Sequence, residues 1–278
     1  MRYLRVFAVI LFIASLIFTV WSNIQYLGRQ NNDIPVFTNE FDLLEVNAKD
    51  GEAALLQGLT AHDETDGDLT EHIMIASISH FLEPGLTNVK YVVFDAHSNS
   101  ATITRKVRFI DYRSPQFTLS KSPVYVKGEN FDLLDHIRVS DVLDGDISDQ
   151  VRILTNAVSN FNEGVYPVVL EVSNSCGDTS RLELLVTYLS EPNTANIQLK
   201  QNIVYLPAGE EFNPTEWIES VTDMQGNALN VRRVTVQGNL DTATPGYYTL
   251  TYQYNFRDLK GYAAVTVIVT EGVQDDAQ

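Results

Sequence analysis

Acidic residues gather at one turn of the sequence in a spacing that could hold a cation. Asp63, Asp66 and Asp68 fall within six residues, and Asp95 and Asn99 follow at the end of an apolar segment. Carboxylate and amide oxygens are the ligands that Ca²⁺ takes in proteins. The spacing differs from that of an EF-hand loop, which needs a Glu at a fixed distance after its Gly. These five residues are therefore a candidate calcium site.

The same pattern occurs twice more along the chain. The second copy consists of Asp141, Asp144, Asp146, Asn174 and Asp178. The third copy has drifted to Asp223, Gln225, Asn227, Phe256 and Lys260. Phenylalanine and lysine offer no oxygen ligand, so the calcium hypothesis applies to the first two copies alone.

A simpler interpretation of the acidic pattern needs no metal, and we favour it. Asp66-Gly67-Asp68 has the composition of a tight turn, in which Gly supplies a positive φ angle. Aspartate side chains at such turns accept hydrogen bonds from nearby backbone amides. The two interpretations differ in whether calcium stabilises the folded protein.

Motifs of known enzymes are missing from the sequence. The five histidines do not have the spacing of a zinc protease, and Cys176 is the single cysteine, which excludes a disulfide within the chain and a zinc site built on several cysteines. There is no nucleophile elbow, phosphate-binding loop or dinucleotide fingerprint. Trp217, Tyr247 and Tyr262 could form a strip for stacking sugars, although such residues more often pack in the fold. We expect a protein that is not an enzyme and needs no cofactor.

The charge of the chain limits its partners. The 278 residues include 19 Lys and Arg and 36 Asp and Glu, which gives a formal net charge of −17. This charge repels nucleic acid and anionic lipid, so we expect neither as a partner. An acidic surface also promotes solubility.

The first thirty residues have the character of a membrane segment. No charged residue lies between Arg5 and Arg29, and the middle of this stretch is apolar. A helix of about 20 such residues crosses a bilayer, and basic residues before it keep the N-terminus inside. We predict a single-pass transmembrane signal anchor at residues 1–30, with the rest outside the cell. A cleaved signal peptide is the alternative, but no Ala-x-Ala site follows the apolar stretch.

The remainder of the chain contains three repeats of roughly 80 residues each, a length that suits a complete small β-sandwich. The predicted domains are residues 33–111, 112–190 and the more divergent 195–271, followed by a disordered tail at 272–278. The first two are joined with little slack at residues 111–115, whereas the segment around Pro192 has the composition of a linker. We therefore expect the first two domains to move together and the third to be hinged.

Apolar residues alternate at the period of a β-strand within each unit. Tyr248, Leu250, Tyr252 and Tyr254 lie on one side of such a strand, and polar residues separate them. Equivalent inward sets are Val89, Tyr91 and Val93 in the first unit and Tyr166, Val168, Leu170 and Val172 in the second. Each strand precedes a polar turn and another strand, so the sequence predicts all-β sandwiches.

Several of these segments together resemble a known family. The stretch 59–70, the Tyr91-Val-Val-Phe-Asp95 strand and the following Asn99-Ser-Ala-Thr102 are similar to the bacterial immunoglobulin-like (Ig-like) domain of Cry22Aa-type and many cell-surface proteins, close to the hyalin-repeat type. The resemblance is good in the first two units and loose in the third. It implies three tandem Ig-like β-sandwich domains serving as a surface stalk or as a protein-interaction or adhesion module. A carbohydrate-binding accessory module of the cell envelope is the alternative, because fold does not fix function.

Overall fold

The computed structural model describes residues 12–22 and 33–271. The chain divides into two compact units, Met1–Asp111 and Tyr112–Gln278, each treated by itself below. Residues 12–22 form a helix whose side chains are all exposed. Within the two described ranges, no helix has both the length and the apolar character needed to cross a bilayer. The rest of the predicted anchor, at 1–11 and 23–30, and the predicted tail at 272–278 lie outside the described residues.

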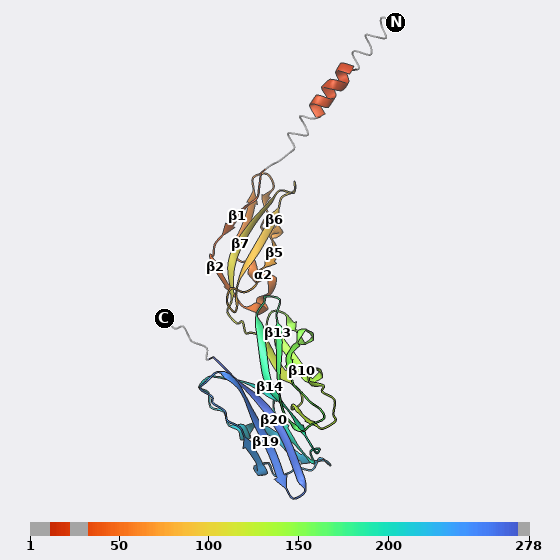
Figure 1. Ribbon diagram of the computed structural model, residues 1–278. Helices are drawn as coiled ribbons and strands as arrows, with labels where there is room; N and C mark the ends of the chain where they lie inside the picture. Colours follow the sequence, from red (N-terminus) through yellow and green to blue (C-terminus); the bar gives the residue numbers. More distant parts are fainter. Residues whose placement is uncertain (1–11, 23–32, 272–278) are drawn as a thin grey trace. The chain divides into compact units, whose positions relative to one another are not determined.

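The first unit contains a sandwich of two sheets, coloured orange to yellow in Figure 1. One sheet has the order β1-β3-β4 and the other the order β2-β7-β6-β5. Their elements are β1 (Val36–Asn39), β2 (Leu43–Val46), η1 (Ala48–Asp50), α2 (Gly51–Leu55), β3 (Leu59–Asp63), β4 (Gly67–Asp68), η2 (Thr70–His72), β5 (Met74–Ile78), β6 (Leu86–Phe94) and β7 (Ser100–Phe109).

The second unit begins with a sandwich of the same design. Its sheets have the orders β11-β10-β8 and β12-β13-β14-β9. Their elements are β8 (Gln116–Leu119), β9 (Val124–Val126), α3 (Leu133–His136), β10 (Ile137–Asp141), β11 (Gly145–Asp146), η3 (Ser148–Gln150), β12 (Arg152–Asn156), β13 (Gly164–Ser173) and β14 (Thr179–Leu189).

A third sandwich completes the second unit, with sheets β15-β17 and β16-β20-β19-β18. Its elements are β15 (Ala195–Leu199), β16 (Ile203–Pro207), η4 (Pro214–Trp217), β17 (Ile218–Asp223), η5 (Val231–Arg233), β18 (Val234–Gln237), β19 (Gly246–Phe256) and β20 (Leu259–Thr270). In all three sandwiches the second strand pairs in parallel with the last, as β2 with β7, β9 with β14 and β16 with β20. The prediction of all-β sandwiches is confirmed.

The core residues are those that the predicted alternation of apolar and polar residues places on the inner face of each strand. Val89, Tyr91 and Val93 are fully buried on β6, and Leu250 and Tyr252 are buried on β19. The equivalent inward residues of β13 are buried from Val168 onward. Polar residues between them face outward, which is the pattern of strands with one face on a core.

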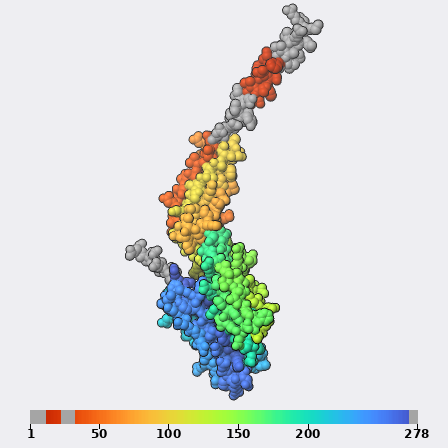
Figure 2. Space-filling view, in the orientation of Figure 1, coloured from red at the N-terminus to blue at the C-terminus, as the bar shows by residue number. Residues whose placement is uncertain are grey.

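The second and third sandwiches share packed surface, so the hinge predicted at Pro192 is wrong. Ile203 and Ile268 of the third sandwich belong to the apolar cluster of the second. The linker is also pinned, because Asn193 exchanges two hydrogen bonds with the backbone of Tyr262, of 2.9 and 3.0 Å, and Thr194 donates to Lys260 O at 2.8 Å. In Figure 2 the green surface of the second sandwich lies directly against the blue surface of the third.

Candidate functional site

The acidic turn of the first sandwich connects β3 to β4 and is tightly hydrogen-bonded. Asp63 ends β3 and is 1% exposed, and its Oδ1 accepts from the N–H groups of Thr65 at 2.9 Å and Asp66 at 3.0 Å. Gly67 has a φ of +78°, the conformation that the sequence assigned to it. Asp68 Oδ1 accepts from Thr70 N at 2.9 Å. The capping that the turn interpretation predicted is therefore present.

The second acidic group lies in the turn after β6. Asp95 is 7% exposed, and its Oδ1 accepts from the backbone N–H groups of His97 at 2.8 Å and Asn99 at 2.7 Å. Its Oδ2 accepts from Asn99 Nδ2 at 2.7 Å. Asp66 joins the two turns, because its Oδ2 accepts from Ala96 N at 2.9 Å. Of the residues predicted from sequence, Asp66 and Asp95 thus come together, whereas Asn99 offers Asp95 a donor rather than an oxygen and Asp68 is bonded within its own turn.

The structure adds one residue that the sequence analysis left aside. Asp66, Asp95 and His97 each offer a ligand atom, and these atoms lie within 4.8 Å of one another. His97 is exposed and follows Asp95 by two residues in the turn. Sequence reasoning passed over His97 because it looked for histidine pairs at helical spacing, and a turn brings a histidine to a carboxylate without such spacing.

The acidic turns of the second sandwich repeat the backbone hydrogen bonds of the first. They differ in the side chain that donates to the second oxygen of the buried aspartate. Asp141 Oδ1 accepts from the N–H groups of Leu143 and Asp144, at 2.8 and 2.9 Å. Its Oδ2 accepts from Asn174 Nδ2 at 3.1 Å. Asp144 Oδ2 accepts from Ser175 N at 2.6 Å, which joins the turns as Asp66 does in the first sandwich.

Two further members of the predicted set stabilise this region locally. Asp178 accepts from Tyr112 Oη at 2.6 Å, and Asn174 Nδ2 donates to the same hydroxyl at 2.8 Å. Burial, followed by the neighbouring Asp178 carboxylate, raises the pKa of Tyr112. Asp146 accepts from both the backbone and the hydroxyl of Ser148, and the hydroxyl's hydrogen bond is the main cause that lowers the pKa of Asp146.

The third sandwich keeps the turn and loses the second acidic group. Asp223 Oδ1 accepts from the N–H groups of Gln225 at 2.9 Å and Asn227 at 2.8 Å, and its Oδ2 accepts from Asn227 Nδ2 at 2.9 Å. The side-chain bond from Asn227 is the largest cause that lowers the pKa of Asp223. Phe256, at the equivalent of Asp95, lies 3.8 Å from the Arg233 guanidinium carbon, measured to the ring centroid.

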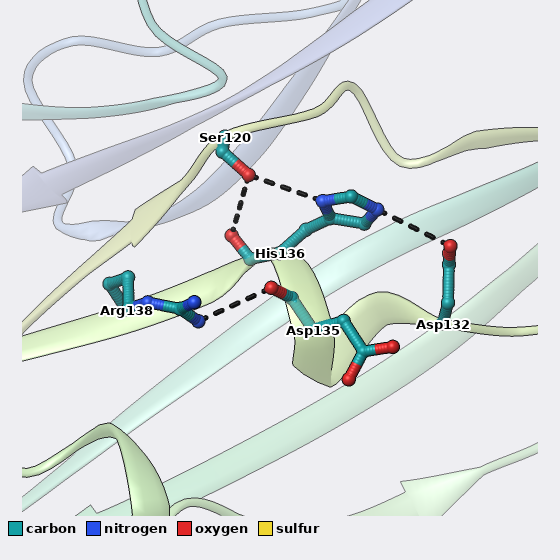
Figure 3. Close-up of polar contacts among 5 residues, drawn as sticks. All are labelled: Ser120, Asp132, Asp135, His136 and Arg138. Carbon is teal, nitrogen blue, oxygen red and sulfur yellow. Dashed lines mark hydrogen bonds and ion pairs between the residues drawn. The ribbon is translucent and has the colours of Figure 1, made fainter.

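A Ser–His–Asp chain on the second sandwich was not visible in the sequence (Figure 3). Ser120 Oγ lies 3.2 Å from His136 Nδ1, and His136 Nε2 lies 3.3 Å from Asp132 Oδ2. Partial burial raises the pKa of Asp132, but Tyr125, Lys121 and His136 together hold it below the ordinary value. The ionised carboxylate is therefore available to orient the ring.

This chain has the hydrogen bonding of a structural network rather than of an activated nucleophile. Ser120 Oγ also lies 3.2 Å from the backbone oxygen of His136, and Ser120 N donates to the same oxygen at 3.0 Å. These contacts extend the pairing of β8 with β10 past its last residue pair. The ring nitrogen that faces the hydroxyl is Nδ1, whereas the general base of hydrolytic triads uses Nε2. A hydroxyl donating to a carbonyl does not donate to a base at the same time.

The aromatic residues singled out for sugar stacking do not form one strip. Trp217 stacks on Phe212, with ring centroids 5.5 Å apart, against the core of the third sandwich. Tyr247 pairs with Ile268, whereas Tyr262 pairs with Gln253, six residues further along β19. This separation is about 20 Å along a strand.

Tyr262 instead lines a groove between the second and third sandwiches. The groove has a volume of about 520 Å³, and its walls come from the start of β13, the end of β14, the linker, the end of β19 and the start of β20. Gln253, Asn255 and Lys260 supply polar groups beside the ring of Tyr262. Lys260 Nζ lies 3.6 Å from Glu191 Oε2 across this groove.

Comparison with known proteins matches part of the chain to a known family. Residues 205–270 match the family model of the bacterial Ig-like domain, group 3. This range covers the third sandwich from within β16 to the end of β20, where the sequence resemblance was loosest. The chain is similar to the pesticidal crystal protein Cry22Aa of Bacillus thuringiensis, with 29% identity over 208 residues, which are 72% of this chain and 28% of that protein.

Two more proteins show similarity to this chain. An uncharacterised 81.3 kDa protein of Acholeplasma phage L2 is 29% identical over 147 residues, 51% of this chain and 20% of that protein. The chain thus spans less than a third of the length of either relative. A solved structure of the M60 catalytic domain with two CBM51 domains from Clostridium perfringens ZmpB covers 85% of this chain and 31% of its own, at 12% identity and a TM-score of 0.24.

Proposed function

We propose that this chain, which carries a bacterial Ig-like domain in residues 205–270, is a membrane-anchored surface protein that holds or presents an interaction face outside the cell. The observation that carries the anchoring is the helix at residues 12–22. Phe12, Ile17, Phe18 and Trp21 on this helix are each more than half exposed. A contiguous exposed apolar surface marks contact with a membrane or another apolar partner.

The sandwiches support a role in spacing or presentation rather than in catalysis. The two in the second unit are fixed to each other by a shared apolar surface, so a binding face on either one keeps its orientation to the other. We propose that the protein is not an enzyme, because the Ser120–His136–Asp132 chain is engaged in strand pairing.

Cell fractionation tests the anchored location, with N-terminal sequencing of the mature protein. We expect the intact N-terminus in the membrane fraction and digestion of residues 33–271 by protease added outside the cell. Replacing Ile13, Ile17 and Val20 with aspartate should release the protein from the membrane, since charges are costly inside a bilayer. Protein free in the medium with a mature N-terminus near Asn23 would show that the segment is a cleaved signal.

A second candidate function is glycan binding, and the groove beside Tyr262 favours it. Sugars bind where an aromatic ring lies beside amide and charged groups, as Tyr262 lies beside Gln253, Asn255 and Lys260 here. We expect residues 33–278 to bind envelope glycans and Tyr262→Ala to lose that binding, while Tyr247→Ala keeps it. Equal binding by both variants, or none by the wild type in a glycan screen, would remove this candidate.

A further inference from the structure

One buried carboxylate oxygen in the first sandwich has no hydrogen-bond partner among the described residues. It is Asp63 Oδ2, on a residue that is 1% exposed, and the other oxygen of Asp63 accepts two backbone N–H groups. A buried polar atom without a partner costs free energy and is rare in native structures. This oxygen therefore points to a positively charged or donating group that residues 12–22 and 33–271 do not supply.

In the second sandwich a side-chain donor contacts the equivalent carboxylate oxygen. The equivalent oxygen, Asp141 Oδ2, accepts from Asn174 Nδ2 at 3.1 Å. The turns around it match, because Asp66 and Asp144 both bridge to the N–H that follows the end of the long strand, at 2.9 and 2.6 Å. Asp95 occupies the place of Asn174. A carboxylate has no N–H to donate, so the first sandwich replaces a donor with a second negative charge.

We propose that Asp63, Asp66, Asp95 and His97 bind a divalent cation of the Mn²⁺ type. Ligand atoms from Asp66, Asp95 and His97 lie within 4.8 Å of one another. Asp63 adds a buried oxygen without a partner, and in the second sandwich the equivalent oxygen contacts Asn174, the residue that matches Asp95. The cation would satisfy the buried oxygen of Asp63, as the N–H of Asn174 satisfies the equivalent oxygen in the second sandwich.

The chemistry of the four groups selects the class of cation. Carboxylate suits Mg²⁺, Ca²⁺ and Mn²⁺, whereas imidazole suits transition metals and Ca²⁺ is held by oxygen ligands. A set of carboxylates with one imidazole therefore fits Mn²⁺ better than the calcium that the sequence analysis proposed.

A bound cation should stabilise the first sandwich by reducing the repulsion among its carboxylates. Three carboxylates in one place repel one another, and the repulsion is stronger where a group is shielded from water. Asp63 and Asp95 are both buried. A cation that binds the folded state and not the unfolded state stabilises the protein by mass action.

The test is titration of the purified full chain with MnCl₂ after treatment with EDTA, followed by the loss of the electron paramagnetic resonance signal of free Mn²⁺. We expect one Mn²⁺ bound per chain and a rise in the melting temperature of the first unit. His97→Ala should weaken binding by roughly tenfold or more, because it removes an exposed ligand without touching the core. CaCl₂ at equal concentration should give a smaller rise.

The matched variant exchanges two residues without changing the net charge. Asp95→Asn with Asn99→Asp recreates the Asn174–Asp178 pair of the second sandwich and gives Asp63 Oδ2 a donor. This variant should fold, as judged by circular dichroism without metal, and should lose Mn²⁺ binding. The proposal is overturned if the wild type binds no Mn²⁺, if the exchanged variant binds it equally, or if Ca²⁺ alone binds and His97→Ala has no effect.

Discussion

Replacing Arg105 with alanine is expected to lower the free energy of unfolding of the first unit by about 3 to 5 kcal/mol. Arg105 lies on β7, is 2% exposed, and donates to Leu55 O at 2.6 Å and Gln57 O at 2.7 Å. Its guanidinium also contacts Asn39 Oδ1 at 3.2 Å and the Tyr91 hydroxyl at 3.3 Å. Truncation would remove the guanidinium that bridges these acceptors, leave Leu55 O with the Tyr91 hydroxyl as its side-chain donor, and open a cavity.

Hydrogen exchange of the β6 and β7 amides measures this effect inside the intact protein. The slowest amides should exchange about a hundredfold faster or more in Arg105→Ala, since a tenfold change corresponds to about 1.4 kcal/mol. Fluorescence of Trp217 reports on the third sandwich and should be unchanged. Arg105→Leu should recover only part of the loss, because leucine, the residue at the equivalent Leu184, cannot donate to the carbonyls.

Arg108→Ala is the matched control on the same strand. Arg108 lies 2.7 Å from Glu83, but the two side chains are 38% and 56% exposed. Exposed ion pairs contribute at most about 1 kcal/mol. If the two variants accelerate exchange equally, the buried guanidinium does not hold the segment between α2 and β3.

The sequence pattern was sufficient to predict the strands and the turns. Alternation placed Tyr91 and Tyr252 inward, and both are fully buried. Gly67 and Gly145 mark turns that need positive φ, and they have φ of +78° and +75°. These features are local, since each depends on residues within a few positions of one another. Local geometry can be predicted from one sequence without knowing how the chain returns on itself.

The side chains that meet across strands could not be predicted in the same way. Arg105 lies in phase with Ile103 and Val107, so its inward direction was visible, but its acceptors come from a segment almost fifty residues earlier. His97 reaches the acidic group through a turn, and Ser120 meets His136 through strand pairing. In each case the partner is fixed by register between elements, which composition and spacing do not contain.

The sequence does contain a pattern that argues against the hinge predicted at Pro192. Residues 263–269 are buried without interruption, so β20 lies between two apolar surfaces rather than one. Val265 and Val267 pack in the core of the third sandwich, while Ile268 packs against the second. A continuous apolar run is typical of a strand covered on both faces. The apolar run in β20 therefore predicts a contact between the second and third sandwiches, despite the linker composition around Pro192.

Replacing Ile268 with aspartate is expected to uncouple the second sandwich from the third. Ile268 is 7% exposed, and a carboxylate placed there without a partner costs several kcal/mol, because the charge loses its hydration. Ile268 does not belong to the core of its own sandwich, so the third sandwich should remain folded. The charge acts on the contact between the sandwiches, where Phe117 N donates to Tyr205 Oη at 2.7 Å and Asn202 Nδ2 donates to Leu119 O at 2.9 Å.

Scanning calorimetry of residues 33–278 measures the uncoupling. In the wild type, residues 112–271 should unfold in one transition, because the edge of β8 and the apolar surface of β16 and β20 are shared. In Ile268→Asp this transition should split into two, with the Trp217 fluorescence change following only one of them. Val231→Asp adds the same charge to the third sandwich at a residue that is 40% exposed, and it should leave a single transition. Two separate transitions already in the wild type, with Ile268→Asp shifting neither of them further than Val231→Asp does, would mean that the two sandwiches do not stabilise each other, and the hinge at Pro192 would again describe the chain.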